Sequence, residues 1–108
     1  MKIFISQPMR DKTDEQIKSE RAKAVDKVKK MYPDEKVEIL DTFFEGAPHD
    51  AKPLWFLGKS IQYLGNADIA YFIGDWRNYR GCCAENYVAK KYGVKVIEEQ
   101  SEIKKVEV

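Results

Sequence analysis

Four short apolar segments alternate along the chain with three longer segments in which apolar residues recur every three or four positions. The apolar segments span residues 2–5, 37–40, 67–73 and 94–97, as is typical of strands bounded by turns. This alternation predicts right-handed crossovers and a mostly parallel sheet. We therefore expect an α/β fold: a three-layer, doubly wound, mostly parallel sheet of four to five strands with helices on both faces, of the Rossmann or flavodoxin type. Residues 103–108 would supply a fifth edge strand or a docked tail.

The expected helices carry start and stop signals. Thr13 and Gln16 fit a capping box at the start of the first helix, and Pro33 stops it. Its apolar face would consist of Ile17, Ala24, Val28 and Met31. Pro53 is a suitable first residue for the second helix, which Gly65 would end. Its buried stripe would consist of Leu54, Leu57, Ile61 and Leu64, and the third helix would run from about Gly81 to Tyr92.

The composition predicts a single domain over residues 1–108, because a chain of this length has no room for a second core. Its hydrophobic content of 44% is ordinary for a globular protein, and a net charge of +1 gives no basic field for a nucleic acid polymer. No apolar run approaches the roughly 18 residues of a membrane span. The chain enters a strand at once without an export segment, and its two cysteines are adjacent, so we expect a cytoplasmic protein.

The apolar segment 67–73 leads through a loop into the third helix, with Glu85 in the first turn of that helix. In an open α/β sheet, ligands bind at the carboxyl ends of the strands, where this loop lies. A glutamate there also interacts favourably with the helix dipole by about 0.3–1 kcal/mol in any protein, so a purely stabilising role stays open. Gly81 and the small residues Ala84 and Ala89 would let a flat substrate approach. Glu85 is therefore a candidate catalytic residue, and Gly81 a candidate substrate contact.

The loop after the first strand offers a candidate anion site. Neither a P-loop nor a dinucleotide-binding fingerprint is present. Ser6 and Gln7 are nevertheless candidate substrate-binding residues together with Arg10, whose guanidinium suits phosphate geometry. In the alternative interpretation, Ser6 and Gln7 only satisfy loop backbone groups and Arg10 is solvated. The residues alone favour neither interpretation.

The loop after the third strand is polar and aromatic, and it contains Asp75, Trp76 and Tyr79. Such a loop is suited to stacking on a base and closing over a polar ligand, although an ordinary surface loop is the alternative. Asp41 ends the second strand and would lie on the same rim as a substrate contact. Asp68 opens the third strand, and we expect it to cap backbone groups away from the site.

The cysteines and aromatic residues suggest further roles. Cys82, Cys83 and His49 lack metal-ligand spacing. A thiol at a helix N-terminus has a lowered pKa, so Cys82 is a candidate reactive residue, although packing as a small apolar residue is the favoured interpretation. An aromatic cluster is expected to form part of the pocket wall and part of a subunit interface, in a homodimer or larger homo-oligomer. Its members are Phe43, Phe44, Trp55 and Phe56.

Three sequence features together resemble the nucleoside 2-deoxyribosyltransferase-like superfamily. They are the N-terminal Lys2-Ile3-Phe4-Ile5-Ser6-x-Pro8-Met9, the buried Ala67-Asp68-Ile69 and Gly81-x-x-x-Glu85 at a helix start. The resemblance covers nearly the whole chain in the order of its elements. More closely, the Ser-Gln-Pro-Met segment and residues 43–48 resemble a small branch of that superfamily found in bacteria and phages.

The resemblance implies that Glu85 attacks C1′ of a deoxyribose and forms a glycosyl-enzyme, which water or another base then resolves. Three helper positions of the family differ in this chain. Phe4 lies near the family's orienting tyrosine, Tyr79 aligns with an aspartate, and an acidic residue of the preceding helix aligns with about Ser60. Because the helper acids of the transferases are absent, hydrolysis is favoured over base transfer.

We therefore expect N-glycosidic bond chemistry on a nucleoside or nucleoside 5′-phosphate, with Glu85 as nucleophile and Asp75 or Tyr79 as proton donor. Ser6 and Arg10 would bind the 5′-phosphate, as the resemblance implies. Neither a cofactor nor a metal is expected for this chemistry. An inactive nucleotide-binding or sensing module of the same fold is the main alternative. An interaction domain that uses the aromatic cluster is a third possibility.

Overall fold

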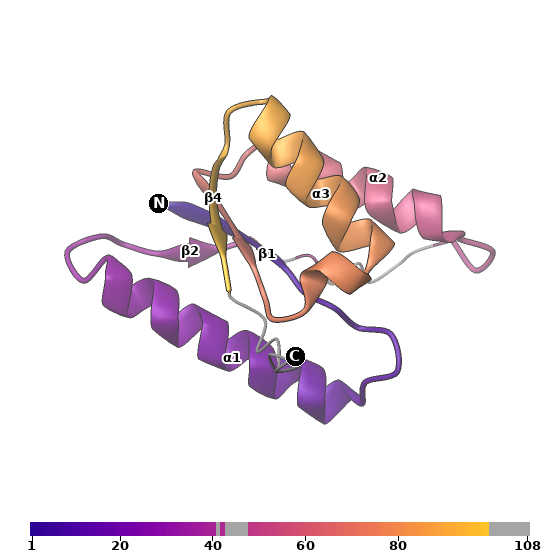
Figure 1. The fold of residues 1–108 in the computed structure, drawn as a ribbon, viewed down its shortest axis with the longest axis horizontal. Coiled ribbons are helices and arrows are strands. Elements are labelled where there is room, and N and C mark those ends of the chain that lie inside the picture. The colour runs from indigo at the N-terminus through magenta and orange to yellow at the C-terminus, as the bar shows by residue number, and fades with distance from the viewer. Residues whose placement is uncertain (41, 43–47, 100–108) are drawn as a thin grey trace, which may run out of the picture.

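The fold is a four-stranded parallel sheet covered by helices, as a computed structural model that describes residues 1–40, 42 and 48–99 shows (Figure 1). The strand order is β2-β1-β3-β4, and every neighbouring pair is parallel. The strands are β1 (Lys2–Ser6), β2 (Glu38–Ile39), β3 (Ile69–Phe72) and β4 (Lys95–Glu98). The predicted α/β architecture is confirmed, while the suggested fifth strand at residues 103–108 lies outside the described residues.

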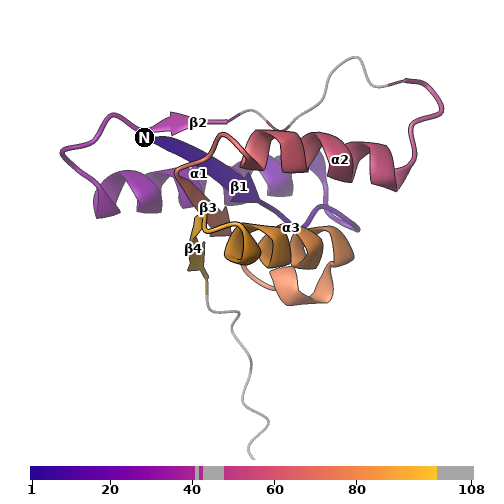
Figure 2. The same cartoon turned by 90° about the horizontal axis from the view of Figure 1, so that it is seen from above.

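The helices lie on both faces of the sheet. Helix α1 (Asp14–Met31) covers one face, and α2 (Pro53–Leu64) and α3 (Arg80–Lys91) cover the other (Figure 2). The chain moves from β1 to β2 in one direction and then crosses back past β1 to β3, so right-handed crossovers place α1 and α2 on opposite faces. The reversal puts a topological switch point at the carboxyl ends of β1 and β3.

Alternation along the central strands divides the core into two layers. Odd-numbered residues of β1 and β3 pack with Ala24 and Val28 of α1. Even-numbered residues of the same strands pack with Leu64 of α2 and with Cys82 and Ala89 of α3. Because both faces are covered, these strands are apolar at successive positions rather than alternating with polar residues.

Helix α1 follows the sequence prediction except at its end. Thr13 Oγ1 accepts the backbone N–H of Gln16, and the Gln16 side chain accepts the backbone N–H of Thr13, which completes the predicted capping box. Three residues of the predicted apolar face are buried, but Met31 is 53% exposed. The prediction for Met31 is wrong because the helix ends there, and Tyr32 packs against the core in its place.

Helix α2 begins at Pro53 as predicted, but most of its expected buried stripe is not buried. Leu64 alone of that stripe lies in the core, whereas Leu54 is 77% exposed and Leu57 only partly covered. The helix reaches the sheet at its C-terminal end, and its first turns border a cavity. Gly65 ends the helix with φ −61°, which is not the left-handed cap that a terminal glycine suggests.

The start of β3 is held as expected, because the backbone N–H of Lys2 donates to Asp68 Oδ2 at 2.6 Å. At the other end of the strand, Gly74 adopts φ 54°, a left-handed conformation that favours glycine. Glu99 accepts the Gly74 N–H at 3.0 Å and the Tyr71 hydroxyl at 2.6 Å, so the turn after β3 is tied to the end of β4.

In the described part of the chain, no helix has the length and apolar character needed to cross a membrane.

Candidate functional site

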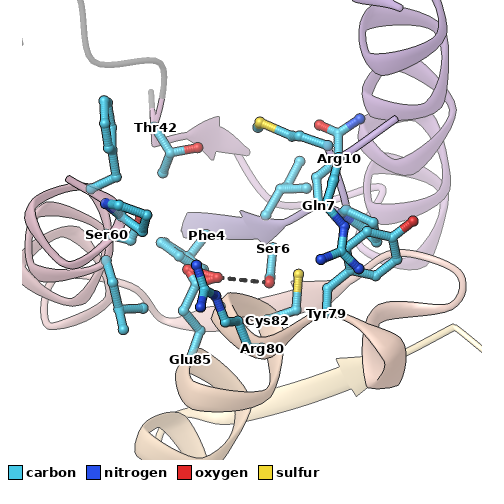
Figure 3. Close-up of a pocket in the computed structure, with 17 residues that line it drawn as sticks. Phe4, Ser6, Gln7, Arg10, Thr42, Ser60, Tyr79, Arg80, Cys82 and Glu85 are labelled. Atoms are coloured by element: carbon cyan, nitrogen blue, oxygen red, sulfur yellow. Dashed lines mark hydrogen bonds between the residues drawn. The ribbon is translucent and has the colours of Figure 1, made fainter. Parts of the chain in front are cut away.

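A cavity of about 380 Å³ lies at the carboxyl end of β1, between α2 and α3 (Figure 3). Residues 4–10 form one wall, the first turns of α2 form a second, and the start of α3 forms the third. Thr42, which follows β2, also borders the cavity. A cavity therefore lies at the switch point of the sheet, which is where ligands bind in this class of fold.

Glu85 lies in this cavity with little access to solvent. The Ser6 hydroxyl donates to Glu85 Oε1 at 3.0 Å, and the two residues are 1% and 8% exposed, respectively. Ser6 is the last residue of β1, and Glu85 lies on α3, so the bond joins the central strand to the helix that follows the neighbouring strand. The fold thus brings together two polar residues that are 79 positions apart.

Burial raises the pKa of Glu85 to about 7, and the hydrogen bond from Ser6 opposes that rise only in part. The carboxyl group is therefore near half ionisation at neutral pH. A carboxyl whose charge state changes near neutral pH in a cavity is a common feature of catalytic sites, because proton transfer and nucleophilic attack both need tuned acidity. Among the described residues that line the cavity, Glu85 is the only carboxylate.

Cys82 lies beside Ser6 and Glu85, and its surroundings make it unreactive. Burial raises the pKa of its thiol to about 11, and the charge of Glu85 adds to that rise. The raised pKa does not favour the hypothesis of a thiol activated by the helix start. Cys82 packs in the core as the favoured interpretation proposed. The described residues contain no cluster of three or more metal-ligating side chains.

Tyr79 and Arg10 lie together on the far side of the cavity from α2. The Arg10 guanidinium lies over the Tyr79 ring at 5.6 Å from its centroid, and both residues line the cavity. Gly81 also lines it, and a methyl group added at Gly81 would meet no atom within 4 Å. Gly81 therefore leaves room in the cavity rather than allowing two backbones to pack closely.

Two residues of the β3–α3 loop lie elsewhere. Trp76 is 5% exposed and packs against Phe72 in the core, with ring centroids 5.3 Å apart. Its indole does not border the cavity, and this position does not favour the predicted contact with a base. Asp75 is not among the residues that line the cavity either, which leaves Tyr79 as the better placed of the two predicted proton donors. Asp41 lies outside the described residues.

Gln7 borders the cavity, but its side chain is engaged with α1. Its amide nitrogen donates to the Ile17 carbonyl oxygen at 2.6 Å, which ties the loop after β1 to the first turn of α1. The amide oxygen is buried and has no hydrogen-bond partner in the described structure. The structure therefore supports for Gln7 the alternative role, that of satisfying backbone groups.

Sequence reasoning missed Arg80 and Leu57 as residues of the cavity. Arg80 is the first residue of α3 and lines the cavity, and Figure 3 shows its guanidinium on the same side as Glu85. A basic residue directly before Gly81 was the available signal. Phe56 of α2 lines the cavity, as the predicted pocket wall implies, and Leu57, which was predicted to be buried in the core, lines it too. Phe4 and Ser60, where the resemblance expects helper groups, both border the cavity.

Comparisons with known proteins add no relative: no family model, no curated protein and no solved structure matches this chain. The function is therefore inferred from the geometry of the site and from the residues that resemble the superfamily named above.

Proposed function

We propose that the protein cleaves the N-glycosidic bond of a nucleoside or nucleoside 5′-phosphate, with Glu85 as the nucleophile. The observation that carries this proposal is the position of Glu85, a buried carboxyl held by Ser6 in a cavity at the switch point of a parallel sheet. The cavity of about 380 Å³ lies within the size range of small-molecule sites. The residues that resemble the deoxyribosyltransferase-like superfamily support the same chemistry.

In the proposed reaction, the Glu85 carboxylate attacks C1′ while the bond between C1′ and the base nitrogen breaks. The base leaves with the bonding electrons and takes up a proton from the Tyr79 hydroxyl, because Tyr79 borders the cavity and the other predicted donor, Asp75, is not among its described lining residues. Water then attacks C1′ and gives a proton back to the Tyr79 phenolate while the bond to Glu85 breaks. The Glu85 carboxylate and the Tyr79 hydroxyl are thereby regenerated, and the free sugar is the product. Hydrolysis is proposed over base transfer because Ser60 and Tyr79 stand where the resemblance expects the helper acids of the transferases.

Ser6 takes a different part from the one expected. Its hydroxyl is engaged by Glu85, so it orients the nucleophile and supplies the hydroxyl that Phe4 lacks. The 5′-phosphate would then be bound by Arg10, which has no ion-pair partner in the described part of the chain, and by backbone N–H groups of the loop after β1.

A nucleotide-binding or sensing module is the second candidate, and one observation favours it. Retaining glycosidases use two carboxyl groups, whereas the described cavity wall contains Glu85 alone. Such a module would bind nucleotides without converting them.

We also propose that the chain self-associates through α2, because Leu54 and Phe56 are 77% and 41% exposed on a largely apolar helix.

The test compares wild type with Glu85→Gln and Glu85→Ala on a panel of nucleosides and 2′-deoxynucleoside 5′-monophosphates. Free base is quantified by chromatography, and binding by calorimetry. The proposal predicts base release by wild type and a loss of at least about 10³-fold in both variants, with binding retained in Glu85→Gln. Binding without any product would establish the module instead. Equal turnover by wild type and Glu85→Ala would reject Glu85 as nucleophile.

A further inference from the structure

A second hollow of about 480 Å³ adjoins the cavity of Glu85. Four residues line both spaces, namely Pro53, Leu57, Arg80 and Gly81. The outer hollow adds Lys52 and Leu54, so the two spaces form one recess that runs from Glu85 along the starts of α2 and α3. The recess has room for a ligand that extends beyond the part held next to Glu85.

The charged side chains that line the outer hollow are Lys52 and Arg80, and both are cationic. Neither has a carboxylate within 4.0 Å in the described part of the chain. Arg77 and Lys90, by contrast, both contact Glu98, at 2.8 and 2.7 Å. Two unpaired cations that share a hollow attract an anion, since each is uncompensated in the ligand-free protein.

Arg80 is also not neutralised by the carboxyl of the inner cavity. Arg80 and Glu85 form no ion pair within 4.0 Å in the described part of the chain. Figure 3 shows Arg80 on the same side of the cavity as Glu85, and Arg80 lines both spaces. The guanidinium is therefore available to a ligand that occupies both.

The two cations do not stabilise the helices on which they lie. Lys52 immediately precedes α2, Arg80 begins α3, and neither helix has an acidic residue in its first turn. A positive charge at that end of a helix interacts unfavourably with the helix dipole. This unfavourable interaction destabilises the ligand-free protein, so the two cations fit a role in binding rather than in folding.

We infer that the hollow between Lys52 and Arg80 binds a second phosphate group of the ligand, so that the preferred ligand is a nucleotide with two phosphates. The inference rests on the proposed function, which provides the nucleotide and places its sugar beside Glu85. Arg10 binds the first phosphate on the side of Tyr79, and Arg80 with Lys52 binds the second on the side of α2. Guanidinium groups suit this task because they form paired hydrogen bonds with phosphate oxygens.

Calorimetry with 2′-deoxynucleosides, their 5′-monophosphates, 5′-diphosphates and 3′,5′-bisphosphates tests the inference on wild type, Lys52→Gln and Arg80→Gln. Lys23→Gln is the matched control, because Lys23 is an exposed lysine of α1 on the opposite face of the sheet. One of the two-phosphate ligands should bind wild type about tenfold more tightly than the monophosphate. Each site variant should remove most of that gain, whereas the control should keep it, and melting temperatures of the site variants should not fall.

The outcomes separate this inference from the proposed function. If monophosphates bind but a second phosphate adds nothing, or if the site variants keep the gain, the second phosphate site is rejected and the proposed function stands. Base-free pyrophosphate, followed by NMR shifts of the Arg80 and Gly81 amides, provides an independent measurement. Shifts that Lys52→Gln and Arg80→Gln abolish would support the anion site even if no nucleotide were cleaved. If neither nucleotides nor pyrophosphate bind, both proposals are rejected.

Discussion

Replacing Glu85 by glutamine should stabilise the protein at high pH and leave its stability nearly unchanged at low pH. The carboxyl has a pKa of about 7 in the folded protein, against 4.5 for a solvent-exposed glutamate side chain. The folded state therefore binds the proton more tightly than the unfolded state does. Stability from this group is fully present below pH 4.5 and is lost as the pH rises through 7, because the buried group must then ionise.

The size of the effect follows from that difference. One pKa unit corresponds to about 1.4 kcal/mol, so ionisation of Glu85 lowers the free energy of unfolding by about 3 kcal/mol between pH 4 and pH 8. Glutamine preserves the shape and accepts the Ser6 hydroxyl through its amide oxygen, but it carries no charge to desolvate. Urea denaturation at half-unit pH steps measures the free energy of unfolding. That free energy should become larger for Glu85→Gln than for wild type as the pH rises from 4 to 8, by up to about 3 kcal/mol.

A matched control removes the same charge at the surface. Glu35 is exposed and lies away from the cavity, so Glu35→Gln should follow wild type across the pH range within about 0.5 kcal/mol. A constant difference between Glu85→Gln and wild type from pH 4 to 8 would refute the reasoning, because it would mean that burial does not raise the pKa of Glu85. This measurement needs no substrate and so does not depend on the proposed reaction.

Two further predictions concern the neighbours of Glu85. Ser6→Ala removes the hydrogen bond that lowers the pKa of Glu85, so that pKa should rise further above 7. A carboxyl ¹³C NMR titration would show the rise, and an unchanged midpoint would contradict the hydrogen bond. Cys82 is buried and its thiol has a pKa of about 11, whereas Cys83 is exposed. An aromatic disulfide reagent at pH 8 should therefore label Cys83 quickly and Cys82 only after denaturation. Fast labelling that persists in Cys83→Ser would contradict this assignment.

The fold was predictable because its signals are local. Each strand of the sheet is a short apolar segment, and Thr13, Gln16 and Pro53 mark helix starts through backbone hydrogen bonds and a fixed φ that depend on adjacent residues. The layer order followed from the alternation of these elements, since right-handed crossovers leave few arrangements. The errors concern the depth of burial. Leu54 and Met31 have the spacing of core residues, but spacing does not reveal where a helix extends beyond the sheet that it covers.

The site was predictable only in part. Glu85 and Tyr79 border the cavity as expected, because the ends of strands and starts of helices meet at one edge of a parallel sheet. Trp76 is the informative difference, because a polar loop usually exposes its aromatic residues, whereas here the short 3₁₀ turn Trp76–Asn78 directs the indole back onto Phe72. No residue near Trp76 in the sequence indicates that direction.

The sequence by itself determined the order of elements and the parallel sheet, because these depend on local periodicity and on chain-connection rules. It predicted Glu85 in the first turn of the third helix, whereas α3 begins at Arg80 and Glu85 lies in its second turn. Tertiary structure alone decided that Ser6 and Glu85, 79 positions apart, form a hydrogen bond, and that burial raises the pKa of Glu85 to about 7. It also decided that Arg80 and Lys52 line the same hollow. Desolvation and charge proximity depend on distances in space, which residues far apart in the chain acquire only when the sheet and its helices pack together.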